Sequence, residues 1–245
     1  MTGRSENHPL KEFYSDIYLI YDRVNRVFTF GRDMAWRRRA VEACLVDNPG
    51  SVLDVCTGTG DFILEAARQL GEGGKDVRLT GYDFNREMLR EADRKQEMLR
   101  LSGTAPEIDF MEGDAGNMPF GEGVFDAMGI TFGIRNLLFE NPNAERHLRE
   151  LFRVLKPGGR LVILESSRPG NPVWRLFNNI YLRFFLPLLG GVISGNLQAY
   201  RYLARSSRNY YTRKEMCAIL EGAGFRLLGE RSLFLGSVML VEATR

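Results

Sequence analysis

The sequence predicts an α/β protein built on a doubly wound, mostly parallel β-sheet that ends in an antiparallel hairpin. From residue 51 onward, short β-branched segments alternate with helix-length segments. Right-handed crossovers between such strands give a parallel sheet with helices on both faces. Near the end of the chain, two apolar runs within 225–244 are separated by one glycine. That pattern favours a hairpin with an antiparallel strand at the sheet edge.

Each expected element has its own local signal. The strands are short and rich in β-branched or aromatic residues, and they are expected at 51–55, 77–83, 107–114, 124–132 and 160–166. Between and after them, helices are expected at 61–70, 85–101, 143–155 and 212–221. Asn85 is a plausible N-cap for the second helix. Glycine-rich segments at 71–74 and 156–159 are expected to close two of the helices.

Two regions fall outside this alternation, within an expected single domain of residues 1–245. Residues 10–45 read as two helices joined near Gly31, and residues 172–207 as an aromatic-rich helical insertion; both are expected to cover the functional site. In the insertion, apolar residues recur at helical spacing: Trp174, Phe177, Ile180, Tyr181, Phe184 and Leu188. Such a face is either buried in a core or forms a tunnel wall or membrane-resting surface, with Arg175 and Arg183 beside it.

Composition excludes several classes of protein. The net charge is only +2, which argues against a nucleic-acid partner. The three cysteines are scattered without a C-x-x-C pair, so neither a disulfide framework nor a metal site is expected, and a reducing cytoplasm fits best. No secretory signal or apolar run of about 18 residues is visible. The basic run at 36–39, WRRR, is interpreted as a solvated helix face, with membrane contact as the lesser alternative.

The bend after the first strand, in the sequence VLDVCTGTGD, is the first candidate ligand site. Asp54 ends the apolar run, and Gly58 and Gly60 lack side chains that would keep a ligand away from backbone N–H groups. The next strand ends at Asp83 and the third leads to Asp114. Because parallel strands present their carboxyl ends at one sheet edge, these groups are expected to share a crevice. Asp83 suits ribose hydroxyls, and Asp114 suits an adenine edge.

The ligand is expected to be a cationic nucleoside instead of a dinucleotide. A dinucleotide fold places pyrophosphate at the helix N-terminus. Here Asp61 begins that helix, and its charge would repel a phosphate. The same carboxylate suits an amino group or a sulfonium. S-adenosylmethionine has both and carries no phosphate.

At this point the sequence resembles a known group, the ubiquinone/menaquinone biosynthesis C-methyltransferases. The resemblance is carried, over about residues 13–225, by VLDVCTGTGD, GYDFNREML, GDAGNMPF, FDAMGITFGIRN, RVLKPGGRLVILESSRP and AYRYLARSSRNYY. It implies a seven-stranded, Rossmann-like class I methyltransferase fold. It also implies methyl transfer from S-adenosylmethionine to a ring carbon of a prenylated quinol. The cofactor residues that it implies are Thr59, Asp83, Asp114, Ala115 and Thr131.

Further features of the resemblance concern the N-terminal helix and two departures. The motif Y-D-x-x-N matches Tyr21, Asp22 and Asn25, in a helix expected to cover the site. Glycine often stands in this class at the position of Cys56. A tail histidine common in the family is absent from GSVMLVEATR, so no tail residue is assigned to catalysis.

Methylation of a quinol carbon requires a group that stabilises charge on a ring oxygen. Arg135 follows the fourth strand and is assigned to hold the quinolate oxygen, since a guanidinium does not act as a base. Asn136 is expected to orient the ring, and Tyr21 and Tyr200 to donate to a ring oxygen or relay its proton. His147 is expected on the back of the sheet. The proton acceptor stays open, with relayed water as the default.

The leading hypothesis is a cytoplasmic quinol C-methyltransferase in peripheral contact with the inner face of the membrane. Demethylmenaquinol is favoured over a methoxybenzoquinol as the substrate. Another small-molecule methyltransferase is the first alternative. A nicotinamide oxidoreductase and a non-catalytic nucleoside-binding module are further alternatives, and a homodimer stays open.

Overall fold

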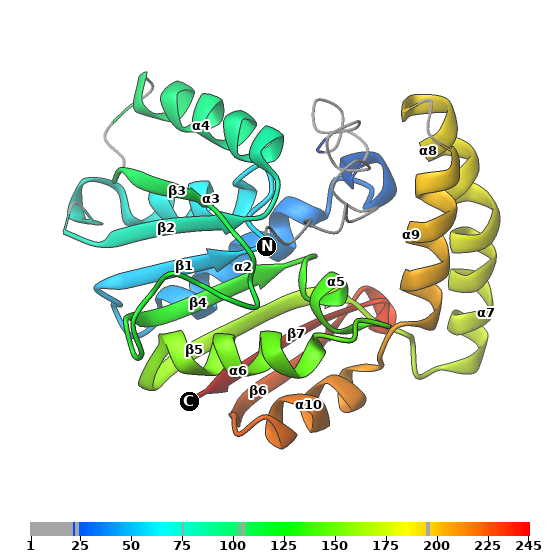
Figure 1. Cartoon of the computed structure of the whole chain (residues 1–245). Helices are drawn as coiled ribbons and strands as arrows, with labels where there is room; N and C mark the ends of the chain where they lie inside the picture. Colours follow the sequence, from blue (N-terminus) through cyan, green and yellow to red (C-terminus); the bar gives the residue numbers. More distant parts are fainter. Residues whose placement is uncertain (1–21, 23–24, 75, 102, 104–105, 195–196) are drawn as a thin grey trace, which may run out of the picture.

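Seven strands form one sheet in the order β3-β2-β1-β4-β5-β7-β6 in the computed structural model (Figure 1). The structure describes residues 22, 25–74, 76–101, 103, 106–194 and 197–245. Strands β1 to β5 run parallel to one another. The strands are β1 Ser51–Val55, β2 Arg78–Asp83, β3 Ile108–Glu112, β4 Phe125–Thr131, β5 Leu155–Ser166, β6 Arg226–Leu233 and β7 Val238–Thr244. The predicted fold class is confirmed.

The C-terminal hairpin differs from the prediction in one detail. Strand β7 pairs antiparallel with both β5 and β6, so it lies one position inside the sheet. The edge strand β6 therefore runs in the same direction as β1 to β5. The last strand of the chain, β7, lies between β5 and β6, and this arrangement leaves β6 at the edge of the sheet.

Strand β5 begins earlier than the sequence predicts. Leu155 already pairs with Phe125, and the register then shifts between Phe125 and Ala127. Gly158 sits at φ +77°, a left-handed conformation that glycine adopts readily. The predicted helix ends directly before the segment 156–159, at Val154, and the segment itself is an irregular part of the strand that follows.

The two faces of the sheet bury separate cores. Along β1, Val52 faces one core and Leu53 the other, and Val162 and Ile163 do the same along β5. This alternation follows from the two-residue period of a strand whose faces are both covered. One face carries α2 Asp33–Leu45 and α3 Asp61–Leu70; the other carries α5 Ile134–Leu138, α6 Ala144–Val154 and α10 Arg213–Gly222. Helix α4 Arg86–Leu101 packs beside β3 and β2.

The helix starts follow local capping chemistry. Asn85 Oδ1 accepts the Met88 N–H at 3.0 Å, so the predicted N-cap of α4 is confirmed. Thr212 and Glu215 form a capping box at the start of α10. Short 3₁₀ turns, η1 Gly71–Gly74 and η3 Phe234–Gly236, follow α3 and β6.

The insertion stands beyond the carboxyl ends of the central strands (Figure 1). It comprises α7 Pro172–Ile180, the π-helical turn η2 Tyr181–Phe185, α8 Leu186–Ser194 and α9 Leu197–Asn209. Tyr181 donates its hydroxyl to the Phe28 carbonyl at 2.9 Å, which joins η2 to the helical residues 25–28. Trp174 Nε1 donates to Ser237 Oγ at 2.9 Å, which joins α7 to the β6–β7 connection. Described residues of both helical regions, 25–45 and 172–207, therefore meet at one end of the sheet.

Candidate functional site

The bend between β1 and α3, residues 56–60, is held by backbone contacts with the end of β2. The Thr57 N–H donates to the Tyr82 carbonyl at 3.1 Å. The Gly58 N–H donates to Asp83 Oδ2 at 2.9 Å. We call this segment the glycine bend.

Its two glycines have different roles. Gly58 adopts φ +55°, and a Cβ atom there would meet nothing within 4 Å, as a ligand cradle requires. Gly60 adopts φ +81°, but its Cβ atom would lie 3.0 Å from the Ala92 Cβ. The expectation that both glycines open the backbone to a ligand is therefore wrong for Gly60. That residue lets α3 pack closely against α4.

Cys56 is compatible with this bend because Gly133 faces it. Cys56 adopts φ +57°, a left-handed conformation that costs a non-glycine residue about 1–2 kcal/mol. A Cβ atom at Gly133 would lie 2.4 Å from the Cys56 Cβ, so only glycine fits opposite this cysteine. The glycine of TFGIRN thus makes room for the departure noted at position 56.

Two buried carboxylates lie beside the bend. Asp83 accepts the N–H groups of Gly58 and Asn85, each at 2.9 Å. Burial raises its pKa to about 6 in spite of these hydrogen bonds. Asp54 Oδ2 accepts the Thr57 hydroxyl at 2.5 Å, and burial raises the pKa of Asp54 to about 7. Both carboxylates therefore change charge within the neutral range.

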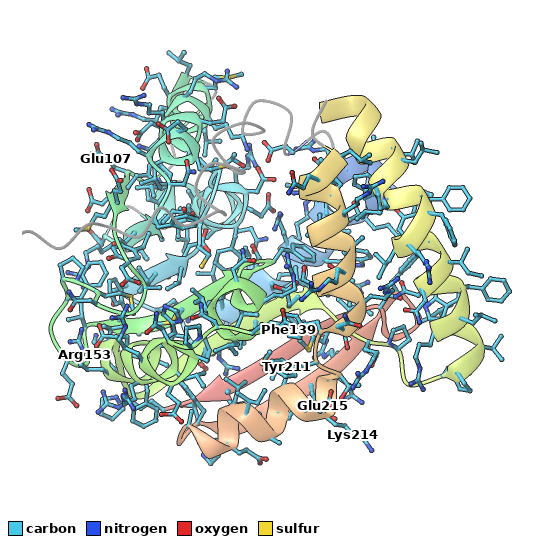
Figure 2. The ribbon with its side chains drawn as sticks, turned by 45° about the vertical axis from the view of Figure 1, so that its right-hand side comes forward. Glu107, Phe139, Arg153, Tyr211, Lys214 and Glu215 are labelled. Atoms are coloured by element: carbon cyan, nitrogen blue, oxygen red, sulfur yellow. The ribbon has the colours of Figure 1, made fainter. Side chains whose placement is uncertain are left out.

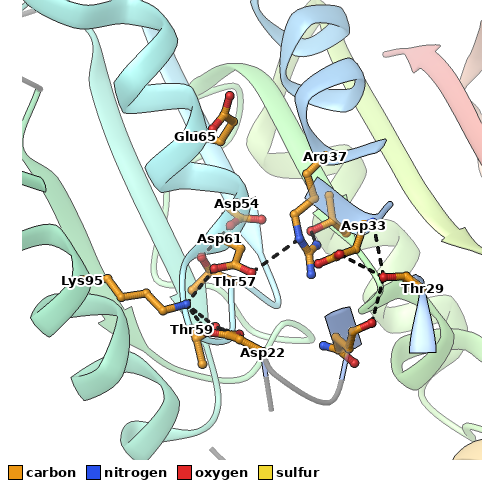
Figure 3. A network of polar contacts seen from close by, with 12 residues as sticks. Asp22, Thr29, Asp33, Arg37, Asp54, Thr57, Thr59, Asp61, Glu65 and Lys95 are labelled. Carbon is orange, nitrogen blue, oxygen red and sulfur yellow. Dashed lines mark hydrogen bonds and ion pairs between the residues drawn. The ribbon is translucent and has the colours of Figure 1, made fainter. Parts of the chain in front are cut away.

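Asp61 lies between two cations, as Figure 3 shows. Lys95 Nζ donates to Asp61 Oδ1 at 2.7 Å, and Arg37 Nε lies 3.8 Å from Asp61 Oδ2. Burial raises the pKa of Asp61, but Arg37 and Lys95 outweigh burial and lower it below its usual range. Lys95 also donates to Thr59 Oγ1 at 3.0 Å and pairs with Asp22, and Thr59 donates to Asp22 Oδ1 at 2.7 Å. The N-terminal helical region thus contacts the glycine bend through Asp22.

Thr131, at the end of β4, contacts a residue that the sequence places elsewhere. Its Oγ1 accepts Arg37 Nη1 at 2.9 Å. The interpretation of 36–39 as a solvated face is wrong for Trp36 and Arg37, which are buried, although Arg38 and Arg39 are exposed. The reason is that α2 packs on the sheet with its 36, 37, 40, 41 and 44 positions inward.

Asp114 and Ala115 follow β3 at the outer part of the same edge. The Asp114 side chain is 54% exposed and pairs with Arg146 at 2.6 Å, while Ala115 is buried. The expectation that His147 lies on the back of the sheet is wrong. Its Nε2 is 3.7 Å from Asp114 Oδ1, and its Nδ1 is 2.8 Å from the Leu137 carbonyl oxygen. Helix α6 therefore places two basic side chains, Arg146 and His147, beside Asp114.

A cavity of about 360 Å³ lies beyond the carboxyl ends of β4 and β5 and beside the start of β7, and Arg37, which pairs with Asp61, lies on its wall. Its wall is mostly apolar and includes Phe28, Trp36, Phe132, Trp174, Phe177 and Tyr200. Among its charged lining residues are Asp33, Arg37, Arg135 and Glu165. We call it the apolar cavity. Described residues of both helical regions line it, together with the sheet edge.

Arg135 is buried at the edge of the apolar cavity. Its Nη1 donates to Ser206 Oγ at 2.6 Å, so α9 holds the guanidinium. Its backbone N–H donates to Glu165 Oε2 at 3.2 Å. Glu165, near the end of β5, also accepts the N–H and hydroxyl of Ser166, each at 2.8 Å. A cation and a carboxylate thus reach the cavity wall side by side.

The other predicted catalytic residues are placed differently. Tyr200 is buried and lines the cavity, with its ring 5.9 Å from that of Phe28. Asn136 lies one residue beyond Arg135 in α5, but it is not among the residues that line the cavity. Tyr21 lies outside the described residues. The structure thus brings Arg135 and Tyr200 together and leaves Asn136 behind them.

The outer side of the insertion is apolar and exposed. Figure 2 shows side chains that point outward into solvent along the yellow helices of the insertion. No residue of α7 is buried. The interpretation of this stretch as an ordinary buried face is therefore wrong, because α7 has cavity on one side and solvent on the other. The exposed residues, which we call the outer apolar face, are Val173, Leu176, Phe177, Ile180, Phe184, Phe185, Leu188 and Leu189.

Three site residues escaped the sequence reasoning. Arg37 lies four residues before buried Val41, so helical periodicity could have placed it inward. Lys95 is one of many charges on α4 and carries no local signal. Glu165 closes an apolar strand in LES, where strand-end position alone could have marked it, as it marked Asp83.

Two negative findings apply to the described ranges. No group of three or more His, Cys, Asp and Glu side chains within them is arranged to hold a metal ion. None of the helices found there is long and apolar enough to cross a membrane.

Comparison with known proteins places these features in context. The model of the ubiE/COQ5 methyltransferase family matches residues 1–244. A demethylmenaquinone methyltransferase of Thermus thermophilus is 42% identical over 221 residues, which are 90% of this chain and 94% of the relative. A ubiquinone/menaquinone biosynthesis C-methyltransferase UbiE of Geobacter sulfurreducens is 38% identical over 230 residues, 93% of this chain and 84% of the relative.

Solved structures share the fold at lower identity. The [4+2]-cyclase SpnF gives a TM-score of 0.65 at 16% identity and covers 96% of this chain and 94% of its own. A SAM-dependent methyltransferase from Aquifex aeolicus gives 0.53 at 21% identity and covers 79% of this chain and 80% of its own. Because a cyclase and a methyltransferase share this fold, the fold alone does not decide the reaction.

Proposed function

The chain belongs to the ubiE/COQ5 methyltransferase family, and from that premise we propose that it methylates a ring carbon of a prenylated quinol. S-adenosylmethionine is the methyl donor. Demethylmenaquinol is the favoured acceptor, since relatives at 42% and 37% identity carry the name demethylmenaquinone methyltransferase. The reaction is a C-methylation in quinone biosynthesis.

One observation carries the proposal: a mostly apolar cavity, whose lining residue Arg37 pairs with Asp61 just after the glycine bend, has Arg135 and Glu165 on its wall. An aromatic ring with a long apolar tail needs apolar walls, and a ring hydroxyl needs polar partners. Arg135 and Glu165 supply those partners in a site whose wall is mostly apolar.

The residues at the bend fit the cofactor. Gly58 leaves open space where a Cβ would stand, and Asp83 offers a buried carboxylate to the ribose hydroxyls. Asp114 and Ala115 would hold the adenine, and Thr59, Gly60, Asp61, Asp54 and Thr131 would surround the remainder. When bound, the cofactor supplies a sulfonium methyl group that is already electrophilic. The protein therefore has to position the acceptor and exclude water.

Activation of the acceptor is assigned to Arg135 and Glu165. Glu165 takes the proton of the ring hydroxyl, and Arg135 holds the resulting quinolate oxygen. Ser206 fixes the guanidinium, so Arg135 is preorganised for the charge that develops. A bound cofactor would supply the methyl group and leave as the thioether. The proton of the methylated ring carbon would pass to the ring oxygen held by Arg135, which restores the aromatic quinol, and Glu165 would release its proton to solvent.

Tyr200, Tyr21 and Asn136 have lesser roles in this proposal. Tyr200 lies on the cavity wall and donates to a ring oxygen or relays a proton. Tyr21 is proposed to share that role from the N-terminal helix. Asn136 supports the ring from behind Arg135 by holding α5 in place, since its carbonyl accepts Asn141 Nδ2 at 2.9 Å.

Access from the bilayer is proposed to use the outer apolar face. Phe177 belongs both to this face and to the lining of the apolar cavity. Arg183 lies with its guanidinium carbon 5.6 Å from the centre of the Phe184 ring, where it can pair with an acidic headgroup. We propose peripheral contact with the membrane surface, with 25–45 and 172–207 closing over the quinol ring.

The test is a methyl-transfer assay with demethylmenaquinol and a methoxybenzoquinol offered side by side. We expect demethylmenaquinol to give a product whose mass exceeds that of the substrate by one methylene unit, with the new methyl group on a ring carbon. Methyl transfer only to oxygen, or to neither quinol, would contradict the proposal.

A further inference from the structure

Arg37 joins the glycine bend to the apolar cavity. It belongs to α2, yet its side chain is only 5% exposed. Its Nη1 donates to Thr131 Oγ1 at 2.9 Å, and its guanidinium carbon lies 5.0 Å from the centre of the Phe132 ring. Phe132 itself adopts φ +57°, a strained conformation that points to a positional requirement. A buried arginine thus stands at the end of β4, between the cofactor site and the acceptor site.

Arg37 belongs to a network of four charged side chains at the glycine bend. Asp61 is shared between Arg37 and Lys95, and Lys95 also pairs with Asp22 (Figure 3). Two cations and two carboxylates therefore face one another within the described residues at the bend. Buried charges are costly unless each has a partner of opposite sign. Among the described residues, however, buried Arg37 Nε has no hydrogen-bond partner, so the guanidinium keeps a donor for an incoming ligand.

S-adenosylmethionine has such a pair at its amino-acid end, an α-ammonium and an α-carboxylate. The sequence reasoning matched Asp61 only to positive charge. The carboxylate needs a cation of its own, and a guanidinium suits it because its N–H groups form a planar fork. Arg37 also lies where such a contact is possible, because it contacts both Thr131 at the end of β4 and Asp61 at the start of α3.

We propose that Arg37 and Asp61 form a subsite for the amino-acid end of the cofactor, with Arg37 binding the α-carboxylate and Asp61 the α-ammonium. The inference rests on the proposed function, because it deepens the use of the same cofactor site. The subsite makes binding depend on the carboxylate as well as on the nucleoside. A purely structural Arg37, which only neutralises Asp61 and ties α2 to β4, would not discriminate between ligands.

Three nucleosides separate these roles in titration calorimetry. S-adenosylhomocysteine carries the complete amino-acid end, its decarboxylated analogue keeps only the amine, and 5′-methylthioadenosine lacks both groups. In the unmodified protein we expect the decarboxylated analogue to bind ~10-fold more weakly than S-adenosylhomocysteine, since a charge-assisted contact is lost. In Arg37→Met that difference should fall to about twofold or less.

The same variant gives a second readout. Arg37→Met should weaken S-adenosylhomocysteine by ~5- to 10-fold while 5′-methylthioadenosine changes by less than about twofold. Arg38→Met is the matched control: the neighbouring arginine is 62% exposed and pairs with Glu65 at 3.5 Å, so all three affinities should be unchanged. Arg37→Lys should recover part of the loss.

Each other outcome overturns the inference. If Arg37→Met weakens all three nucleosides equally, or if its analogues still differ 10-fold, the carboxylate is not bound by Arg37. If Arg37→Met does not fold, equal affinity of the unmodified protein for S-adenosylhomocysteine and its decarboxylated analogue would still refute a carboxylate subsite. Failure of the unmodified protein to bind any of the three would instead refute the proposed function itself.

Discussion

Asp83 and Asp54 differ from surface carboxylates because the sheet buries both of them beside the glycine bend. Burial raises their pKa values to about 6 and about 7. The raised pKa values make stability depend on pH. At pH values between the ordinary carboxyl pKa of 3.8 and these raised values, the folded state binds more protons than the unfolded state. These two groups therefore lower the stability of the ligand-free protein as pH rises from about 4 to about 7.

The affinity for the ligand should change with pH in the direction opposite to that of folding stability. Ribose hydroxyls are better held by an ionised Asp83, so the affinity for S-adenosylhomocysteine should fall as pH drops through about 6. Calorimetry between pH 5 and pH 8 measures this step. In Asp83→Asn the step near pH 6 should be absent, and an unchanged profile in that variant would show that another group is responsible.

Arg135 and Asp83 should separate binding from chemistry. Asp83→Ala removes the proposed partner of the ribose hydroxyls and should abolish detectable cofactor binding. Arg135→Ala should leave cofactor affinity intact and lower turnover by ~100-fold or more, because the quinolate oxygen loses its cation. Single-turnover assays together with calorimetry measure both quantities. Equal loss of cofactor affinity in the two variants would contradict the role of Arg135.

Glu165 is expected to act as the proton acceptor. Glu165→Gln keeps an acceptor oxygen for the Arg135 N–H but cannot take a proton. We expect turnover to fall by ~100-fold or more, with residual activity rising as pH increases because hydroxide replaces the missing base. A pH–rate profile parallel to that of the unmodified enzyme would assign Glu165 a merely structural role.

At the scale of elements, the β1–α3 turn is a tight junction whose glycines are not equivalent. Gly60→Ala combines a left-handed φ of +81° with a Cβ atom 3.0 Å from the Ala92 Cβ, and should cost about 2–4 kcal/mol of unfolding free energy. Gly58→Ala faces open space and should cost about 1–2 kcal/mol. Urea denaturation measures both. Equal costs would mean that packing against α4 does not constrain Gly60.

The ligand response should reverse this order. Gly58→Ala places a methyl group in the ligand cradle, so it should weaken the binding of S-adenosylhomocysteine more than Gly60→Ala does.

The π-helical turn η2 is a second element with a local task. It joins α7 to α8 without a loop, and its Tyr181 and Leu182 line the apolar cavity. Such turns are common at functional sites.

At the scale of the whole molecule, the cavity and the outer apolar face lie on the same helical insertion. Phe184 is 60% exposed, so Phe184→Ser should lower binding to vesicles containing an anionic lipid by about 10-fold. Leu101→Ser is the control, because Leu101 is 81% exposed at the end of α4 and lies outside the insertion. Vesicle flotation measures both. Loss of binding in the control, or none in Phe184→Ser, would contradict the membrane assignment.

Most of the fold was predictable because its signals are local. The two-residue alternation in Val52 and Leu53 marks a strand with both faces buried, and the Asn85 and Thr212 caps mark helix starts. Position at or just after a strand end was enough to place Asp83 beside the glycine bend and Arg135 at the cavity wall. The charge of Asp61 at the start of the first helix then indicated a cationic nucleoside, and the short motifs of the family resemblance indicated methyl transfer from S-adenosylmethionine.

The sequence by itself determined the order of the elements, the mostly parallel sheet and the chemistry of the cofactor, because strand period, turn glycines and motif spacing are properties of neighbouring residues. Only the tertiary structure decided that Arg37 is buried and Arg38 is not, that Glu165 reaches the cavity, and that α7 is exposed. Those facts depend on which distant segments meet: α2 against β4, β5 against α5, and the insertion against residues 25–28. The free energy of burying a charge or an apolar side chain is set by such meetings and not by its neighbours along the chain.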